Sequence, residues 1–208
     1  AVFHAKTGDL EDPPALNALP KYDVTIEGDD VVVKLPEKLK RSRLPAMVAH
    51  DLQSDNRTFV IVGAGAAGNA AAQTLREDGY KGRIVMITYE AQLPYDRPNL
   101  SKAYLQGEAD AKWMPLRSEK FYQNHGIELM RLQKVINVDV TKKLIIFEDG
   151  SQLKYDALLL ATGSVPRTLD IPGSNLNNIF TLRSYDDADK IIAACKQASR
   201  IAVIGASF

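Results

Sequence analysis

The sequence predicts an α/β protein whose parallel β-sheet carries an antiparallel β insertion. Short continuous apolar runs at 59–62 and 157–161 are typical of parallel strands that are buried on both faces. The alanine-rich segment 69–77 follows the first run and is expected to be a helix, which an Asp-Gly pair ends. A second strand is expected at 83–88, so that strand, helix and strand form a βαβ unit.

The antiparallel part is expected between residues 128 and 155. Turn sequences at 141–143 and 148–151 separate alternating apolar segments, as in β-hairpins. The predicted strands of this part are 128–140, 144–147 and 152–155. Outside it, further helices are expected at 118–123 and 185–197, and another buried strand is expected at Arg200–Ile204.

The bulk composition is that of a globular protein without net charge. Its 208 residues include 26 basic and 26 acidic side chains, so no net field attracts nucleic acid or an acidic membrane. No apolar run approaches the roughly 20 residues that a membrane helix needs. Cys195 is the one cysteine, which excludes an internal disulfide framework and any metal site built from several thiolates of these residues.

The first 35 residues differ from the rest in pattern. Two alternating segments, 22–26 and 31–35, flank a Gly-Asp turn and predict a β-hairpin. Residues 36–56 contain two prolines and a basic run without sustained periodicity, and we interpret them as a linker.

A glycine-rich loop connects the first predicted strand to the helix. Gly63 allows a sharp turn, Gly65 allows the backbone to approach a pyrophosphate, and Gly68 allows the helix to pack closely on the strand. Ala66 and Ala67 belong to the same loop, and the free N–H groups and partial positive charge of the helix N-terminus that follows favour phosphate. The loop therefore predicts a dinucleotide-binding site.

An acidic residue completes this pattern. Glu90 follows the glycines by about 20 residues, near the end of the second strand, where a carboxylate would accept hydrogen bonds from a ribose. A purely structural glycine turn is the alternative, but the order of strand, loop, helix, strand and acid argues against it. The pattern fits either NAD or FAD, so other residues must distinguish the two.

The segment Pro94–Lys102 makes that distinction. Its sequence, Pro-Tyr-Asp-Arg-Pro-Asn-Leu-Ser-Lys, resembles the segment P-Y-x-R-P-x-L-S-K of the reductases that supply electrons to ferredoxins and of the apoptosis-inducing-factor group. The resemblance implies a Rossmann-like FAD-binding domain in which this segment crosses the flavin ring. It implies that Lys102 lies near the flavin N5 edge, as the catalytic residue, and that Arg97 lies close to the cofactor. A fixed positive charge there would tune the flavin potential.

A second match lies at Tyr155–Ser164, which resembles the Ala-Thr-Gly strand end of the same superfamily. The resemblance implies that the backbone of Ala161, Thr162 and Gly163 passes the flavin pyrophosphate. It also suggests Arg167 as a residue that contacts the cofactor. The backbone of Val135 corresponds to a position that meets the adenine, although a strand valine can equally be a core residue.

The third match is the end of the sequence, residues 200–208, which resembles the opening of an NAD(P)-binding domain with Gly205 as its first glycine. The implied domains are therefore an FAD-binding domain at 57–198, incomplete, and the first strand of an NAD(P)-binding domain at 199–208. The implied reaction is hydride transfer from NAD(P)H to FAD.

The N-terminal segment resembles a different family. Residues 1–8 are similar to the sequence that follows the second ligand box of a Rieske iron–sulfur domain, which makes 1–35 the tail of such a β domain. The resemblance implies a 2Fe-2S cluster in the full-length protein, with all of its ligands outside these residues, and excludes His4 as a ligand. The combination resembles that of the apoptosis-inducing factor-like oxidoreductases of the apoptosis-inducing factor 3 type.

Two functions remain open. In the first, electrons leave the flavin for an attached Rieske domain or another electron-acceptor protein; in the second, the flavoprotein is a redox-sensing or pro-apoptotic signalling switch with little turnover. Thiol–disulfide exchange is excluded because no cysteine precedes Cys195, which we interpret as a core residue. The resemblance implies an intracellular protein, mitochondrial or cytoplasmic, and leaves its oligomeric state open.

Overall fold

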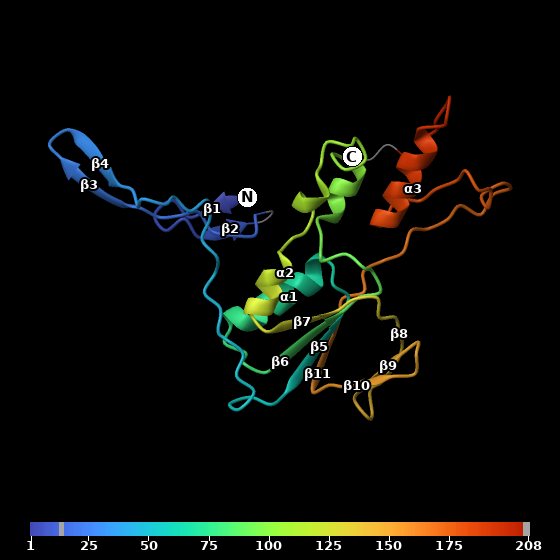
Figure 1. Cartoon of the computed structure of the whole chain (residues 1–208), viewed down its shortest axis with the longest axis horizontal. Coiled ribbons are helices and arrows are strands. Elements are labelled where there is room, and N and C mark those ends of the chain that lie inside the picture. Colours follow the sequence, from blue (N-terminus) through green and yellow to red (C-terminus); the bar gives the residue numbers. More distant parts are fainter. Residues whose placement is uncertain (13–14, 206–208) are drawn as a thin grey trace.

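The computed structural model describes residues 1–12 and 15–205. Figure 1 shows a central sheet with helices above it, an N-terminal part that extends to one side, and a C-terminal part that contains helix α3 on the other. The four-stranded parallel sheet has the order β11-β5-β6-β7, in which the βαβ unit supplies the two inner strands. Its strands are β5 (Thr58–Val62), β6 (Arg83–Ile87), β7 (Ile127–Met130) and β11 (Ala157–Leu160).

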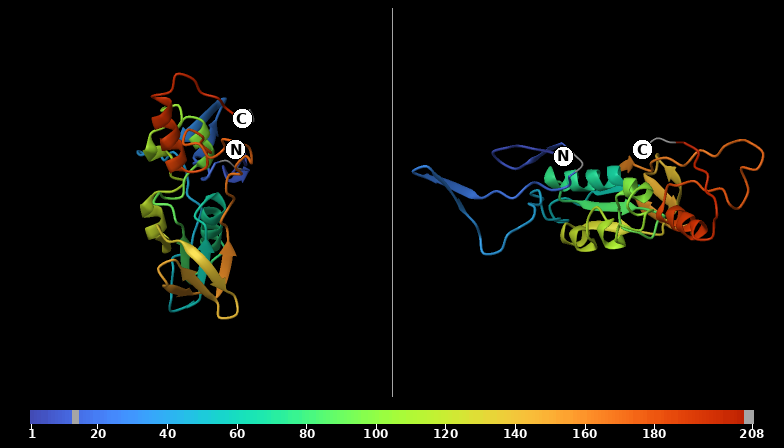
Figure 2. Two further views of the ribbon diagram at one scale, coloured as in Figure 1. Left: turned by 90° about the vertical axis from the view of Figure 1, so that its right-hand side faces the viewer. Right: turned by 90° about the horizontal axis from the view of Figure 1, so that it is seen from above.

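The two faces of this sheet are covered differently, because successive strand residues point to opposite sides. Ile61, Ile84 and Met86 pack against helices α1 (Ala66–Glu77) and α2 (Glu119–Asn124). Val60 and Val85 pack on the opposite side, against the three-stranded antiparallel sheet. That sheet consists of β8 (Val135–Asp139), β9 (Leu144–Phe147) and β10 (Gln152–Lys154), and Figure 2 shows it from two further sides. The predicted fold class is therefore confirmed.

The remaining elements are short. The N-terminal part contains the pairs β1 (Val2–Phe3) with β2 (Leu10–Asp12) and β3 (Asp23–Glu27) with β4 (Asp30–Lys34). The second pair is the hairpin that the sequence predicts. The other elements are the 3-10 helices η1 (Arg97–Ser101) and η2 (Ala111–Trp113) and the helix α3 (Tyr185–Cys195). Cys195 is half-buried, not part of the core.

The prediction of one strand at 128–140 is wrong. The run is divided between β7, which lies in the parallel sheet, and β8, which lies in the antiparallel sheet. The division falls at Arg131–Lys134, where Leu132 has a left-handed backbone with φ of 58°. A β-sheet cannot accommodate that conformation without a break, so the chain changes sheets there.

Two further strand predictions need correction. β11 is an edge strand that pairs with β5 alone, and Leu160 at its end is 62% exposed, so this strand is not buried on both faces. Arg200–Ile204 forms no strand at all, and Val203 is 83% exposed. A buried parallel strand needs neighbours on its edges and faces, and no described segment supplies them for 200–204. Residues 206–208 of the predicted NAD(P) loop lie outside the described residues.

The segment interpreted as a linker is partly attached to the sheet domain. Met47 packs against the helix-covered core. The Val48 N–H donates to the carbonyl of Arg76 over 3.0 Å, and the Asp51 N–H donates to that of Lys81 over 2.9 Å. The second half of 36–56 therefore follows the end of α1 closely, without forming a helix or strand.

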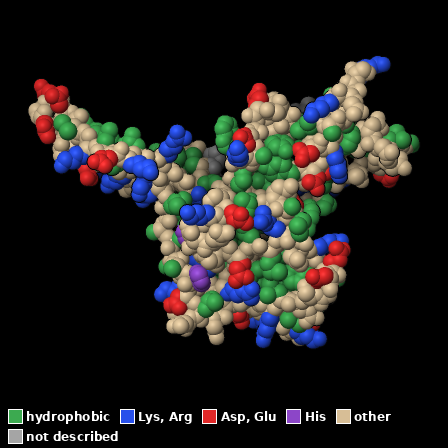
Figure 3. All heavy atoms as spheres, viewed as in Figure 1, with side chains coloured by type: hydrophobic (Ala, Val, Ile, Leu, Met, Phe, Trp, Pro, Cys, Tyr) green, Lys and Arg blue, Asp and Glu red, His purple; other side chains and the backbone are tan. Residues whose placement is uncertain are grey.

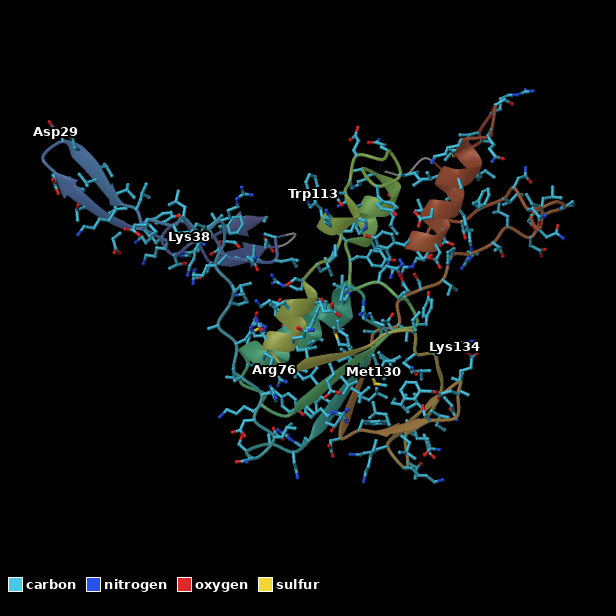
Figure 4. All side chains as sticks on the ribbon, in the orientation of Figure 1. Asp29, Lys38, Arg76, Trp113, Met130 and Lys134 are labelled. Carbon is cyan, nitrogen blue, oxygen red and sulfur yellow. The ribbon has the colours of Figure 1, made fainter. Side chains whose placement is uncertain are left out.

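A buried arginine holds the end of α1 to the sheet. Arg76 has no exposed surface, and Figure 4 marks it at the end of that helix, beside the strands. Its guanidinium donates to four backbone carbonyls, those of Tyr80, Gly82, His125 and Gly126, over 2.6–2.9 Å. Because burial disfavours the charged form, the pKa of Arg76 is lowered, and these carbonyl dipoles must stabilise the cation.

Replacing Arg76 should therefore be costly. Arg76→Met keeps much of the apolar stem but leaves four carbonyls without a donor, so the free energy of unfolding should fall by about 3 kcal/mol or more. Lys134→Met, which removes one exposed ion pair with Glu148, is the control and should change it by less than about 0.5 kcal/mol. Urea unfolding of both variants checks this, and equal midpoints would contradict it.

Candidate cofactor-binding site

The glycine loop lies where the carboxyl ends of β5 and β11 meet. Gly63 has φ of 110°, and a Cβ atom on it would lie 2.1 Å from the carbonyl oxygen of Ala161. A Cβ atom on Gly68 would lie 1.9 Å from the carbonyl oxygen of Gly63. Neither position can carry a side chain without moving the backbone, so these two glycines are required by packing.

Gly65 is glycine for a different reason. A Cβ atom there would meet no protein atom within 4 Å, so the space beside it is open. Gly65 is also the N-cap of α1; it provides no side-chain hydrogen bond to the helix, and the first turn contains no acidic residue. The exposed first residues, Ala66 and Ala67, therefore present uncapped N–H groups beside open space. An anionic group such as a pyrophosphate fits this arrangement.

The predicted Ala-Thr-Gly segment lies against this loop. The Ala161 N–H donates to the carbonyl of Val62 over 2.8 Å, which continues the pairing of β11 with β5. Thr162 and Gly163 follow and are exposed, and Gly163 has φ of 72°. Two segments about 100 residues apart in sequence, both predicted to contact the cofactor, are thus brought together.

Glu90 and Arg97 also meet, and they pair with each other. The Arg97 guanidinium donates to Oε1 of Glu90 over 2.8 Å, and the Tyr95 hydroxyl donates to Oε2 over 2.7 Å. Burial, and then the adjacent Glu90, raise the pKa of Tyr95, so its hydroxyl stays a donor. The Arg97 guanidinium also lies 4.7 Å from the centre of the Tyr95 ring. Two residues of the Pro94–Lys102 segment, Tyr95 and Arg97, therefore fix the side chain of Glu90, the predicted ribose-binding acid.

A second arginine joins this group, and sequence reasoning missed it. The backbone carbonyl of Arg183 accepts a hydrogen bond of 2.8 Å from the Arg97 guanidinium. The Arg183 side chain lies on the Ala-Thr-Gly segment: its Nε donates to the carbonyl of Ser164 over 3.1 Å. Its Nη2 is 2.9 Å from where a Cβ atom of Gly163 would lie. Arg183 thus connects two of the predicted motifs.

A local sequence signal marks the position of Arg183. Ser184 and Asp187 form a capping box at the start of α3, and Oδ2 of Asp187 also accepts the Arg183 N–H over 3.0 Å. The pattern Ser-x-x-Asp before an apolar periodic segment predicts such a helix start. It therefore could have placed Arg183 at the beginning of a helix, although not beside Gly163.

Three predicted residues lie away from this cluster or face solvent. Lys102 is exposed directly after η1, where it ends the segment that contains Arg97. Val135 pairs with Phe147 and packs against the core beneath the antiparallel sheet. Arg167 is exposed in the loop after the Ala-Thr-Gly segment, and Arg183 occupies the place beside that segment instead.

Aromatic packing attaches α3 to the Pro94–Lys102 segment. The Tyr185 ring lies 4.5 Å from that of Tyr95 and 4.9 Å from that of Tyr104, both edge-on. The Tyr104 hydroxyl donates to Oδ1 of Asp189 over 2.8 Å. Burial, and then this carboxylate, raise the pKa of Tyr104 to about 12, and burial raises that of Tyr185 to about 12.

Three further observations concern the described residues. Within residues 1–12 and 15–205, no group of three or more His, Cys, Asp or Glu side chains could hold a metal ion. In the same part of the chain, no helix has both the length and the apolar character that crossing a membrane requires. A cavity of about 590 Å³ lies beside β7 and α2, and its lining includes none of the glycine-loop residues.

The profile of the family described as pyridine nucleotide-disulphide oxidoreductase matches residues 57–208, so the chain belongs to that family. Over its whole length it is 39% identical to human apoptosis-inducing factor 3 and 38% identical to the mouse protein. It spans 35% of the length of these relatives. The apoptosis-inducing factor-like resemblance that the sequence predicts is confirmed.

Bacterial relatives and solved structures cover the sheet domain. A rubredoxin–NAD(+) reductase of Pseudomonas putida is 40% identical over 71% of the chain and 38% of its own length. The crystal structure of a covalent putidaredoxin reductase–putidaredoxin complex contains a chain that is 37% identical to this one, with a TM-score of 0.63. The match covers 66% of this chain and 34% of the length of that chain. These relatives share the fold described above.

The tyrosines beside α3 predict an alkaline loss of stability. Their folded pKa of about 12 exceeds the unfolded value of about 10, so the stability that they contribute is complete below about pH 10. It is lost as the pH rises from about 10 to about 12. The melting temperature should fall across this window, and Tyr104→Phe should reduce the fall because it removes one titrating group. Tyr89→Phe, at a ring that is 67% exposed, is the control, and a Tyr104→Phe profile identical to wild type would refute the assignment.

Proposed function

We propose that this chain is the FAD-binding part of an NAD(P)H-dependent flavin oxidoreductase that passes electrons to an iron–sulfur protein. The observation that carries the proposal is the meeting of the glycine loop with the Ala-Thr-Gly segment. There the open space beside Gly65 faces the uncapped start of α1, and the contact of Gly63 with Ala161 fixes both segments. An FAD pyrophosphate has the charge and the slender shape that this place accepts.

The proposed contacts divide between the two halves of the cofactor. On the nucleotide side, the N–H groups of Ala66 and Ala67 would bind phosphate, Glu90 would accept ribose hydroxyls, and the backbone of Val135 would meet the adenine. Glu90 can do so because each of its oxygens accepts one protein hydrogen bond and retains capacity for another.

On the flavin side, Thr162 and Gly163 would pass the pyrophosphate, and Lys102, Arg97 and Arg183 would supply positive charge. We add Arg183 because its guanidinium lies beside Gly163, whereas Arg167 remains the weaker candidate. Bound FAD accepts two electrons as a hydride and can release them singly, which the protein residues alone cannot do. The role of these residues is to bind, to orient and to keep a cation beside the ring.

The acceptor is proposed from the relatives. Rubredoxin, ferredoxin and putidaredoxin appear in the names of the similar reductases and structures, and each name belongs to a reductase system. We propose an iron–sulfur acceptor for this protein too, either a separate protein or an attached Rieske domain with a 2Fe-2S cluster. These reductase names favour turnover over the signalling alternative.

The N-terminal hairpin supports the attached domain. Val24 is paired with Val33 and Ile26 with Val31, so one face of β3 and β4 is aliphatic, and all four side chains are exposed. A two-stranded hairpin is marginal by itself and gains stability when further strands or a helix cover such a face. We therefore propose that residues 1–35 belong to a β domain, residues 36–56 to the connection and 57–198 to the FAD-binding domain.

The nucleotide substrate completes the proposal. Residues 199–208 would begin the NAD(P)-binding domain, with Gly205, whose φ of 95° suits the first glycine of such a loop. We propose an intracellular location, mitochondrial or cytoplasmic. Steady-state NADH oxidation by the complete protein separates the two functions, since a signalling switch would turn over slowly and keep its nucleotide bound after reduction.

Cofactor binding should depend on Gly65. The complete protein should purify with flavin that denaturation releases as FAD and not FMN. Gly65→Val should abolish this flavin, because a branched side chain would fill the open space beside the uncapped helix start. Ala70→Val, on the exposed side of α1, is the control and should keep the flavin. Normal FAD content in Gly65→Val would show that the cofactor binds elsewhere.

Lys102 should set the flavin potential. Lys102→Ala should leave FAD bound but lower its reduction potential, because the reduced form loses a nearby positive charge. We expect a shift of some tens of millivolts, since about 30 mV corresponds to 1.4 kcal/mol for two electrons. Lys120→Ala, an exposed lysine of α2, is the control. A spectroelectrochemical titration measures both, and an unchanged potential in Lys102→Ala would exclude Lys102 from the flavin edge.

A further inference from the structure

A second buried arginine joins the N-terminal part of the chain to the sheet domain. Arg117 precedes α2 and is 6% exposed. Its Nη2 donates to the carbonyl of Leu16 over 2.6 Å and to Oε1 of Gln73 over 2.7 Å. Its Nη1 donates to the side-chain oxygen of Asn17, and its guanidinium lies 4.7 Å from the centre of the Phe121 ring. One side chain thus contacts the N-terminal part, α1 and α2.

This contact depends on arginine. All three of its hydrogen-bond acceptors are neutral, and burial lowers the pKa of Arg117, so the planar guanidinium must use its several donors together. A lysine has one nitrogen and cannot reach acceptors on Leu16, Asn17 and Gln73 in this fixed arrangement while stacking on an aromatic ring.

The N-terminal side of the contact is itself braced. We define residues 1–44 as the N-terminal unit. In it, Arg43 pairs with the carboxylate of Asp9 and donates to the carbonyl of Thr7 over 3.1 Å. Arg43 also exchanges backbone hydrogen bonds with Ala18, beside Asn17, whose side chain donates to Ser42 over 3.1 Å. In Figure 1, β1 and β2 lie at the end of this unit that is nearer to the central sheet and its helices.

We propose that Arg117 is a positioning residue that locks the N-terminal unit onto α1 and α2. The lock would hold a redox group carried by the domain of that unit in one orientation relative to the flavin. Helix α1 makes both connections, because Gly65 is its N-cap at the proposed cofactor site and Gln73, further along the same helix, accepts a hydrogen bond from Arg117. The space-filling view in Figure 3 shows the N-terminal part extending to one side of the molecule. The functional half of this inference rests on the proposed flavin oxidoreductase function.

Orientation can be measured directly. In the complete protein, with its proposed cluster ligands kept and every other cysteine, including Cys195, replaced by alanine, spin labels are placed at Glu11→Cys in β2 and Lys134→Cys before β8. Double electron–electron resonance then reports the distance between the two parts. Both labelled positions are exposed. We expect a narrow distance distribution for the parent and a broad one for Arg117→Ala and Arg117→Lys. Arg131→Ala, which removes an exposed arginine close in sequence, should stay narrow. A narrow distribution in both Arg117 variants would overturn the lock.

Electron transfer tests the consequence. Two assays driven by NADH separate the steps. Reduction of ferricyanide takes electrons directly from the flavin. Reduction of the attached 2Fe-2S cluster, measured by electron paramagnetic resonance, also requires the correct orientation of the N-terminal unit. Loss of about 1.4 kcal/mol lowers the population of the docked orientation tenfold, and hydrogen bonds from a charged donor contribute more than this. The rate of cluster reduction in the Arg117 variants should therefore fall about tenfold or more. The ferricyanide rate should stay unchanged, which also shows that the variants are folded.

The two hypotheses fail differently. A parent protein that does not reduce ferricyanide with NADH would overturn the proposed function, while the distance measurement would still decide the lock. A broad distance distribution with an unchanged cluster rate would overturn the positioning role. Rescue by Arg117→Lys would overturn the requirement for a planar guanidinium.

Discussion

The close approach of two backbone segments, after β5 and after β11, constrains the whole candidate site. Gly63 lies so close to the Ala161 carbonyl that it cannot carry a side chain, and Gly68 cannot carry one because it lies against the Gly63 carbonyl. This contact sets where α1 begins and where the Ala-Thr-Gly segment runs. Once both are fixed, the uncapped N–H groups of Ala66 and Ala67 and the exposed backbone after Ala161 lie at the same edge of the parallel sheet. The backbone geometry of the candidate site thus follows from packing, with the charged residues arranged around it.

The charged residues form a chain of contacts rather than separate binding groups. Glu90 is held by Tyr95 and Arg97, Arg97 holds the backbone of Arg183, and Arg183 reaches the Ala-Thr-Gly segment. Such preorganised groups lose little freedom when a ligand arrives, which favours binding. The tyrosine cluster then attaches α3, so that Arg183 is positioned by a helix and not by a loop alone.

Local patterns predicted the parts of the structure that local forces determine. The glycine loop, the hairpin turns and the Ser118 helix start each follow from a few adjacent residues, as at Gly150, whose φ is 82°. Tertiary effects decided the rest. Arg167 and Arg183 look alike in sequence, and only the docking of α3 selects the second. No glycine or proline marks the break at Leu132 in the sequence. An apolar run such as 200–204 has the pattern of a buried strand whether or not neighbouring segments cover it.

The pairing of β5 with β11 has a kinetic consequence. The Thr58 N–H donates to the carboxylate of Asp156, 98 positions along the chain, whereas α1, β6, α2 and β7 follow β5 with much shorter connections. Closing so long a loop costs entropy before any contact compensates for it, so nearby elements assemble sooner than distant ones. The dinucleotide loop therefore acquires its final shape late, after the helices have covered the sheet. A newly made chain would first form the βαβ core, with the contact between Gly63 and Ala161 still to be made.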